Sequence, residues 1–322
     1  MTMSRTPRVL YLDQNAWVAL AKGAWDKRKF PHEHAALVNV IAAVLEHGAI
    51  VPLSFTNIYE TIKVNDAARR VHLARTQAIL SGGRVFRGRR RIFADTLAGF
   101  LASRFGLPRP DLPEHWFLSD LWFESASDYS PDLYGFEISD SALSFIRDNA
   151  SNVLFDYLTS SDEEVRRKGV RRYSASSAEL IARIERRRAL VAGQTLALRR
   201  RAYGAQLILD ELEFILTTGR QLGLHWHDVR DIGSSLLRSL PAEVPVLNVE
   251  RELAIRLEDQ ARDVTENDLR DMVAFVTVLT FADVIVAEKP FVNLACQARL
   301  GQHYATRMLT SVLDFTPAAL LA

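Results

Sequence analysis

Acidic side chains follow short apolar runs near both ends of this 322-residue chain. Asp13 directly follows the run at residues 8–12, and Glu288 directly follows the run at residues 283–287. Both runs contain β-branched or aromatic residues, which predicts two buried strands. If these strands are parallel neighbours, both carboxylates point into the crevice beyond the carboxyl ends of the strands, where ligands bind in open α/β sheets.

Three further acids are expected near the same edge. Glu60 lies on the first turns of a predicted helix after a second apolar run, residues 49–53. Asp268 and Asp271 stand three residues apart near the start of another predicted helix, so they share one face. Carboxylates that converge repel each other unless a divalent cation neutralises them, and Mg²⁺ and Mn²⁺ prefer oxygen ligands. Such a cluster, without cysteine or histidine ligands, favours phosphodiester hydrolysis.

Each acid also has a structural interpretation. Asp13 could be a turn former or a helix cap, and Glu60 a solvated or capping-box residue. Asp268 or Asp271 could complement a helix dipole, and Glu288 could lie in an exposed turn. Their common placement at strand ends favours the functional interpretation over these four.

The elements around the acids predict an α/β fold with a parallel sheet. Near the N-terminus, a strand, two helical segments, a second strand and a further helix follow one another, and Gly48 ends the helix expected over residues 32–46. Helical patterns dominate from residue 84 to about 241. The expected elements beyond that point are a strand at 244–249, helices at 250–262 and 267–280, a strand at 283–287, a helix at 291–300 and a strand at 311–315. We therefore expect a core of residues 1–83 and 242–322, interrupted by a helical insertion of residues 84–241.

Three segments resemble the motifs of PIN-domain ribonucleases. Residues 9–15 (VLYLDQN) are similar to the opening strand of that family, with its aspartate followed by any residue and then asparagine or serine. Residues 54–60 (SFTNIYE) are similar to its second motif, and residues 267–291 to its closing motif. The resemblance covers just under half of the chain. It implies a three-layer α/β core, a Mg²⁺- or Mn²⁺-dependent endoribonuclease and, by the habits of the family, a toxin or defence role.

The resemblance also implies roles for individual residues. Asp13 would be the first metal ligand and Glu60 the second, with Asn15 and Ser54 as accessory polar residues. Asp271 lies 17 residues before Glu288, close to the usual spacing in the family, so it is the preferred third ligand, with Asp268 as the alternative. The fourth ligand is usually aspartate; here the position is Glu288, and Asp283 is the alternative.

Basic residues suggest where nucleic acid would bind. The formal net charge is only +1, but arginines gather just after the first half of the core. We expect this basic knot to contact phosphates: Arg84, Arg87, Arg89, Arg90 and Arg91. Residues 110–164 hold 13 acidic side chains and one basic, whereas residues 165–201 hold 12 basic and two acidic. These two blocks either pair with each other or provide an arginine-rich arm for phosphates.

Composition limits the other function classes. With Cys296 as its single cysteine, the chain cannot form an internal disulfide. The scarcity of cysteine predicts a reducing, cytoplasmic setting. The longest apolar stretch is too short to span a bilayer, and there is no Gly-rich phosphate loop, GxSxG or HExxH motif. RNA is the expected substrate, with DNA as the alternative. A catalytically inactive PIN-like binding module is the second hypothesis, and the helical insertion is the expected surface for a protein partner or a second copy.

Overall fold

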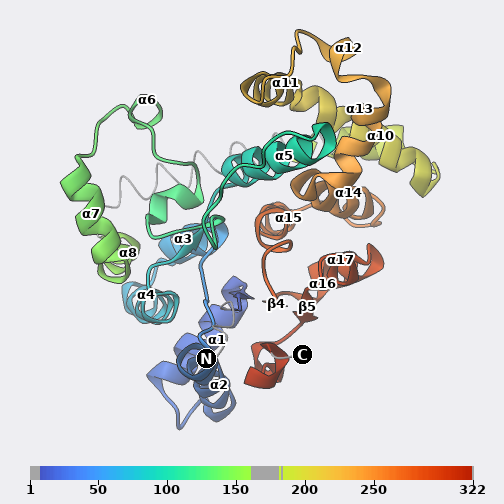
Figure 1. Ribbon diagram of the computed structural model, residues 1–322. Coiled ribbons are helices and arrows are strands. Elements are labelled where there is room, and N and C mark those ends of the chain that lie inside the picture. Colours follow the sequence, from blue (N-terminus) through green and yellow to red (C-terminus); the bar gives the residue numbers. More distant parts are fainter. Residues whose placement is uncertain (1–7, 161–180, 183, 321–322) are drawn as a thin grey trace. The chain divides into compact units, whose positions relative to one another are not determined.

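A computed structural model describes residues 8–160, 181–182 and 184–320 (Figure 1). Its described residues divide into two compact units. The strand unit comprises residues 8–88, 117–160 and 281–320, and the helical unit comprises residues 89–116, 181–182 and 184–280. This division differs from the expected core and insertion. Residues 117–160 pack with the chain ends, and residues 242–280 pack with the helical region.

The strand unit contains the expected parallel sheet from the two ends of the chain. Strand β4 (Val284–Val286) lies between β1 (Leu10–Leu12) and β5 (Arg307–Leu309), and both neighbours are parallel to it. The register pairs Leu12 with Val286, and Val286 with Leu309. The carboxyl ends of the three strands therefore meet at one edge, as the positions of Asp13 and Glu288 required.

Residues 49–53 run beside β1 without forming a full strand. They make one parallel bridge from Ile50 to Val9 and another from Leu53 to Val85. Val85 belongs to β2 (Val85–Phe86), which pairs antiparallel with β3 (Leu118–Ser119). The second predicted strand is thus reduced to two bridges, which place this segment between β1 and β2.

Helices surround this sheet in the strand unit. Helix α1 (Gln14–Trp25) begins directly after β1, and α3 (Phe55–Lys63) begins directly after the bridged segment. Gly48 ends α2 (Pro31–His47) in the left-handed conformation, with φ of 63°, as its position predicts. The remaining helices of the unit are α4 (Ala67–Ser81), η1 (Trp122–Ser125), α6 (Pro131–Tyr134), α7 (Asp140–Asp148), α8 (Ala150–Thr159), α16 (Lys289–Gln297), α17 (Leu300–His303), η2 (Val312–Asp314) and η3 (Pro317–Leu320).

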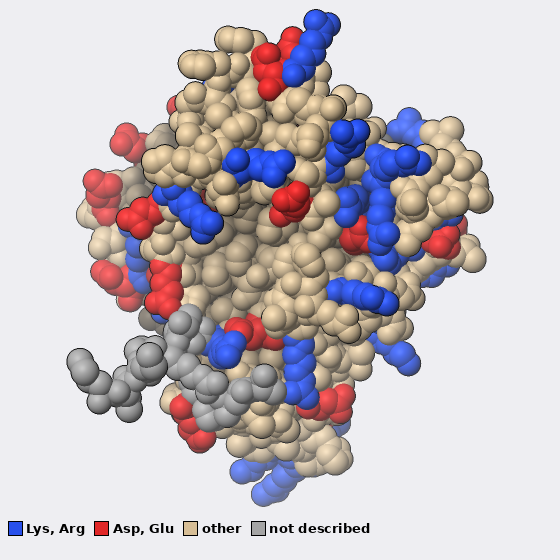
Figure 2. Space-filling model, turned by 45° about the vertical axis from the view of Figure 1, so that its right-hand side comes forward, with Lys and Arg blue, Asp and Glu red and all other residues tan. Residues whose placement is uncertain are grey.

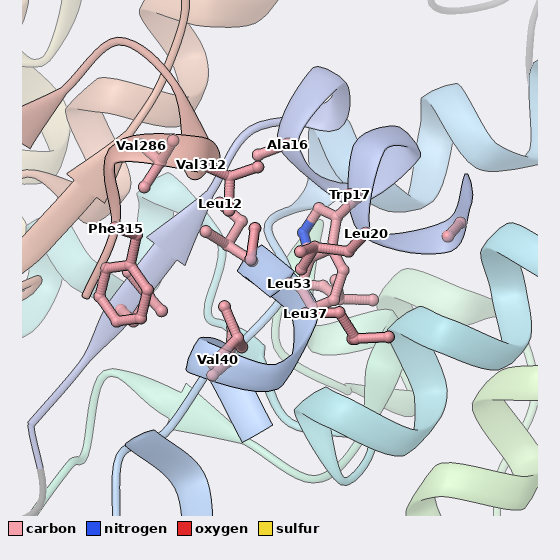
Figure 3. Close-up of a cluster of buried hydrophobic side chains, with 14 of the residues drawn as sticks. Leu12, Ala16, Trp17, Leu20, Leu37, Val40, Leu53, Val286, Val312 and Phe315 are labelled. Atoms are coloured by element: carbon pink, nitrogen blue, oxygen red, sulfur yellow. The ribbon is translucent and has the colours of Figure 1, made fainter. Parts of the chain in front are cut away.

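One apolar core holds this unit together (Figure 3). Leu12 of β1 and Val286 of β4 pack in it with Trp17 and Leu20 of α1 and with Phe315 from the C-terminal segment. Complete burial of a side chain of this size contributes about 1.5–3 kcal/mol. The core therefore fixes the ends of β1 and β4, which carry Asp13 and Glu288.

The described part of the helical unit includes several longer helices. They are α5 (Arg89–Phe105), α10 (Leu196–Asp210), α11 (Leu212–Gln221), α13 (Ser234–Glu243), α14 (Pro245–Leu257) and α15 (Glu266–Val278), with the short α12 (Val229–Ile232) between them. Helix α15 confirms the helix expected over residues 267–280. None of the helices within the described ranges is both long and apolar enough to cross a lipid bilayer.

Two expected strands are wrong. Residues 244–249 form the start of α14 instead of a strand. Pro245 occupies the first turn of this helix, where the missing N–H of proline costs nothing. The apolar side chains Val246, Leu247 and Val249 are fully buried there, and a short apolar run does not distinguish a buried strand from a buried helix. The last strand lies at β5 rather than at residues 311–315, where η2 forms instead.

Candidate active site

Asp13 stands at the carboxyl end of β1 and at the start of α1. Its backbone N–H donates to the Val286 carbonyl of β4 (2.9 Å), which continues the strand pairing. Its side chain caps α1 by accepting a hydrogen bond from the Ala16 N–H (2.9 Å). The capping interpretation of Asp13 is therefore correct, and it holds the carboxylate at the sheet edge.

Asp13 shares a pocket of about 350 Å³ with Glu288. The pocket lies beyond the carboxyl ends of β1, β4 and β5, since each strand is followed by residues that line it. Its lining residues are Asp13, Asn15, Ala16, Ala19, Glu33, Val286, Glu288, Lys289, Pro290, Thr310, Ser311, Val312 and Leu313. All of them belong to the strand unit.

Asn15 connects the two chain ends within this pocket. Its Nδ2 donates to Oε1 of Glu288. Glu288 is the N-cap residue of α16, yet its side chain makes no hydrogen bond to cap that helix. The carboxylate is thus held toward Asn15 and the pocket, and the accessory role expected for Asn15 stays a prediction.

Negative charge surrounds Asp13. Burial, the largest cause, acts together with the charges of Glu288 and Glu60 to raise the pKa of its carboxyl group to about 7, against hydrogen bonds from the Ala16 and Glu288 N–H groups. The two side-chain charges named among the causes of this shift, those of Glu288 and Glu60, are both negative. They oppose ionisation of Asp13 at the place where an ionised group is needed for metal binding.

Glu60 reaches this cluster from α3. It lies half-buried on that helix, and its charge acts on Asp13. Two of the predicted acids, Glu60 and Glu288, are therefore both close enough to influence a third, Asp13. Within the described ranges, however, no three Asp, Glu, His or Cys side chains have the arrangement of a metal-binding group as they stand.

Ser54 has a structural role at the start of α3. It is buried and caps the helix, and its Oγ lies 3.1 Å from the Tyr11 hydroxyl and 2.7 Å from Oγ1 of Thr56. Its capping-box partner is Asn57. Ser54 thus helps to anchor the helix that carries Glu60.

Two alternative ligands are engaged elsewhere. Asp268 accepts two hydrogen bonds from Arg262 (2.7 and 2.5 Å) and forms a capping box with Thr265. Burial opposes its ionisation, but the hydrogen bonds from Arg262 and Thr265 lower its pKa overall. Asp283 stands at the amino end of β4, away from Glu288, and pairs with Arg8 (2.5 Å). The structure therefore does not bring Asp283 to the pocket, and it gives Asp268 a structural partner.

Asp271, the preferred third ligand, lies on α15 in the helical unit and is half-buried. Its side chain has interactions of its own. Its participation in the site stays a prediction from the sequence.

The basic knot is rich in ion pairs. In the strand unit, Arg84 faces Asp120 (3.6 Å) and Arg87 pairs with Glu124 (2.8 Å). In the helical unit, the pairs are Arg89 with Glu211 and Glu250, Arg90 with Glu211, and Arg91 with Asp95. On the face that Figure 2 shows, blue basic and red acidic side chains likewise lie among larger tan areas. These arginines brace the fold, and contacts from them to phosphate remain a prediction.

Several arginines of the arginine-rich block also form ion pairs in the part of the chain that is described. Arg187 pairs with Glu258, Arg199 with Asp259 (2.6 Å) and Arg200 with Glu252 (2.8 Å). Residues 161–180 and Arg183, which carry part of both charge blocks, lie outside the described residues. The pairing partners come from α14 and the residues that follow it, not from the acidic block at residues 110–160.

Sequence reasoning missed four polar residues of the pocket. Thr310 and Ser311 directly follow β5, and they would have been found if the last strand had been placed correctly. Lys289 is the neighbour of Glu288. Glu33 lies in the first turn of α2. No local sequence pattern predicted its place in the pocket, because the close packing of α2 on Gly23 brings it to the pocket. A side-chain carbon at Gly23 would lie 2.4 Å from the Glu33 carbonyl carbon.

Comparisons with protein-family models, curated protein sequences and solved structures found no match for this chain.

Proposed function

We propose that this protein is a metal-dependent nuclease with a PIN-like core, and that its substrate is RNA. The observation that carries the proposal is the pocket that acidic residues share at the carboxyl ends of β1 and β4. Asp13 and Glu288 line it together, and the charge of Glu60 reaches Asp13. Carboxylates that repel each other across a pocket suit a divalent cation, which supplies the missing positive charge.

The topology of the sheet supports a binding site at this place. From one edge, the order is β3, β2, the bridged residues 50–53, β1, β4 and β5. The segments that follow β1 in the sequence therefore lie on one side of β1, whereas β4 and β5 lie on the other side of β1. Ligands of open α/β sheets bind at the carboxyl ends of the strands where the order reverses in this way. Asp13 and Glu288 follow the two strands on either side of that point.

The donor set fits Mg²⁺ or Mn²⁺, because carboxylate oxygens are the ligands that these cations prefer. When bound, such a cation lowers the pKa of a water molecule and stabilises charge on the leaving oxygen of a phosphodiester. Asp13 must give up its proton to bind the cation, and Asn15 holds the Glu288 carboxylate at the pocket. Thr310 and Ser311 provide hydroxyl groups on the far side of β4.

An inactive PIN-like binding module is the second candidate. It is favoured by the finding that, in the described part of the chain, no three acidic, histidine or cysteine side chains are already arranged around a metal position. DNA is the alternative substrate for an active enzyme. Cleavage separates these candidates, because the binding module would cut neither nucleic acid.

The test is cleavage of labelled RNA and DNA with Mn²⁺, Mg²⁺ or EDTA. We expect the wild type to cleave RNA with Mn²⁺ or Mg²⁺, and EDTA to abolish the reaction. Asp13→Asn should lower the cleavage rate at least about 100-fold. Loss of a metal ligand should reduce activity at least as much as loss of a residue that only orients a ligand. Asp66→Asn is the matched control, since Asp66 caps α4 as Asp13 caps α1. Equal cleavage by the wild type and Asp13→Asn would exclude the assigned site.

A further inference from the structure

Helix α3 is tied to β1 and α1 on both sides of Asp13. Leu12 precedes Asp13, and its carbonyl accepts a hydrogen bond from a side chain of α3. Gln14 follows Asp13, and its side chain donates a hydrogen bond to another side chain of α3. The two α3 residues are Asn57 and Thr61. They are four residues apart and therefore share one helix face, and Glu60 stands three residues after Asn57 on the same side.

The first tie is a buried amide. Nδ2 of Asn57 donates to the Leu12 carbonyl (3.3 Å), while its Oδ1 accepts from the Ser54 N–H (2.9 Å) and from the Ser54 hydroxyl (3.0 Å). Asn57 is 1% exposed. A buried polar side chain with its bonds made in this way has one orientation, because any other leaves polar atoms unpaired.

The second tie is a buried hydroxyl. Oγ1 of Thr61 accepts from Nε2 of Gln14 (3.0 Å) and donates to Oε1 of Gln77 on α4 (2.8 Å). Nε2 of Gln77 in turn reaches Oε1 of Gln14 (3.4 Å). Thr61 and Gln77 are completely buried. Three helices thus meet in one closed polar triangle beside Asp13.

We propose that Asn57 and Thr61 are positioning residues that set the distance between the Asp13 and Glu60 carboxylates. The Asp13 and Glu60 carboxylates repel each other when both are ionised and no cation is bound, and this repulsion acts to separate α3 from the start of α1. The two ties hold α3 at Leu12 and Gln14, so the acids stay at a spacing that a cation can bridge. The role in metal binding rests on the proposed function, whereas the role in holding Asp13 against α3 does not.

The experiment compares Thr61→Val, Thr61→Ser and Thr76→Val in the full-length protein. Valine keeps the shape of Thr61 but removes both hydrogen bonds, and serine keeps the hydroxyl. Thr76 is the matched control, because it is a buried threonine of the same unit whose hydroxyl bonds only its own helix, at His72. We expect the dissociation constant for Mn²⁺ to rise about 10-fold or more in Thr61→Val, and to stay within about twofold in the other two variants. Equal Mn²⁺ affinity in Thr61→Val and the wild type would overturn the proposal.

Amide hydrogen exchange separates this inference from the proposed function. Thr61→Val should speed exchange in the first turn of α1, residues 14–17, more than in α2, and Thr61→Ser should not. If the wild type binds no Mn²⁺, the metal proposal fails, and the exchange result alone decides whether Thr61 positions Asp13. If Thr61→Val does not fold, Gln14→Met replaces it, since Gln14 is only half-buried and the Thr61–Gln77 bond stays intact. Unchanged exchange near Asp13 in the folded variant would contradict the positioning role.

Discussion

Asp13→Asn should stabilise the metal-free protein at pH 8 while it removes metal binding. Asparagine is as good a helix cap as aspartate, so α1 keeps its cap. The substitution also removes a charge that is half-buried among other negative charges. Because the pKa of Asp13 is raised from 3.8 to about 7, its ionisation at pH 8 costs the folded state on the order of 2 kcal/mol or more. We expect a higher free energy of unfolding by about that amount.

The pH dependence of stability gives the sign of this effect. Between about pH 4 and pH 7 the folded state retains a proton on Asp13 that the unfolded chain has lost, so the contribution of Asp13 to stability falls as the pH rises through this window. Above about pH 7 both states are ionised and the loss is complete. The stability gain of Asp13→Asn should therefore be small near pH 4 and reach its full size by pH 8. Denaturant unfolding in EDTA at several pH values measures it.

Asp66→Asn is the control of opposite sign. Asp66 caps α4 through the Arg69 N–H, and this hydrogen bond lowers the pKa of its carboxyl group. Its replacement should not stabilise the protein at pH 8. If Asp13→Asn also fails to stabilise the metal-free protein, ionisation of Asp13 does not destabilise the folded state as its surroundings indicate.

Glu252→Ala should strongly destabilise the helical unit. Glu252 is 4% exposed and lies within 2.7–2.9 Å of three guanidinium groups, those of Arg200, Arg251 and Arg256. Removal of the shared acid leaves these three positive charges facing one another. Breaking a buried ion pair in this way costs about 3–5 kcal/mol, because the remaining charge is buried without a partner. Urea unfolding followed by circular dichroism measures the loss.

Glu213→Ala is the comparison for Glu252→Ala. Glu213 pairs with Arg220 at 2.8 Å, but its side chain is 81% exposed, and exposed pairs contribute little. Burial opposes ionisation of Glu252, but hydrogen bonds from Arg200 and Arg256 lower its pKa overall. Its contribution is therefore present above the unfolded pKa of about 4.5 and is lost as the pH falls below it. Similar losses in the two variants would show that the buried arginine cluster adds nothing beyond a surface pair.

Local sequence patterns were sufficient for the part of the site on the two central strands. In each case a short apolar run ends directly before an acid, and the parallel pairing of β1 and β4 confirms that Asp13 and Glu288 share one edge. The polar start of α3 also predicted a capped helix that presents Glu60. These features depend on residues close together in the sequence, which is why they could be predicted.

Features that depend on distant partners could not be predicted. Asp283 and Glu288 stand at the two ends of the same apolar run, and only the direction of β4 and the Arg8 pair separate them. The pairing of Arg89 could not be predicted, because its acidic partners Glu211 and Glu250 lie more than 100 residues away in the sequence.

Calorimetric titration of the wild type and Asp13→Asn with Mn²⁺ at pH 6.5 and pH 8 tests most directly whether these acids hold a cation. The wild type should bind Mn²⁺ more tightly at pH 8, and at pH 6.5 binding should release a proton, since Asp13 must ionise. Asp13→Asn should bind at least about 100-fold more weakly and release no proton. Absence of Mn²⁺ binding by the wild type, or equal binding by Asp13→Asn, would contradict a cation site at the carboxyl ends of β1 and β4.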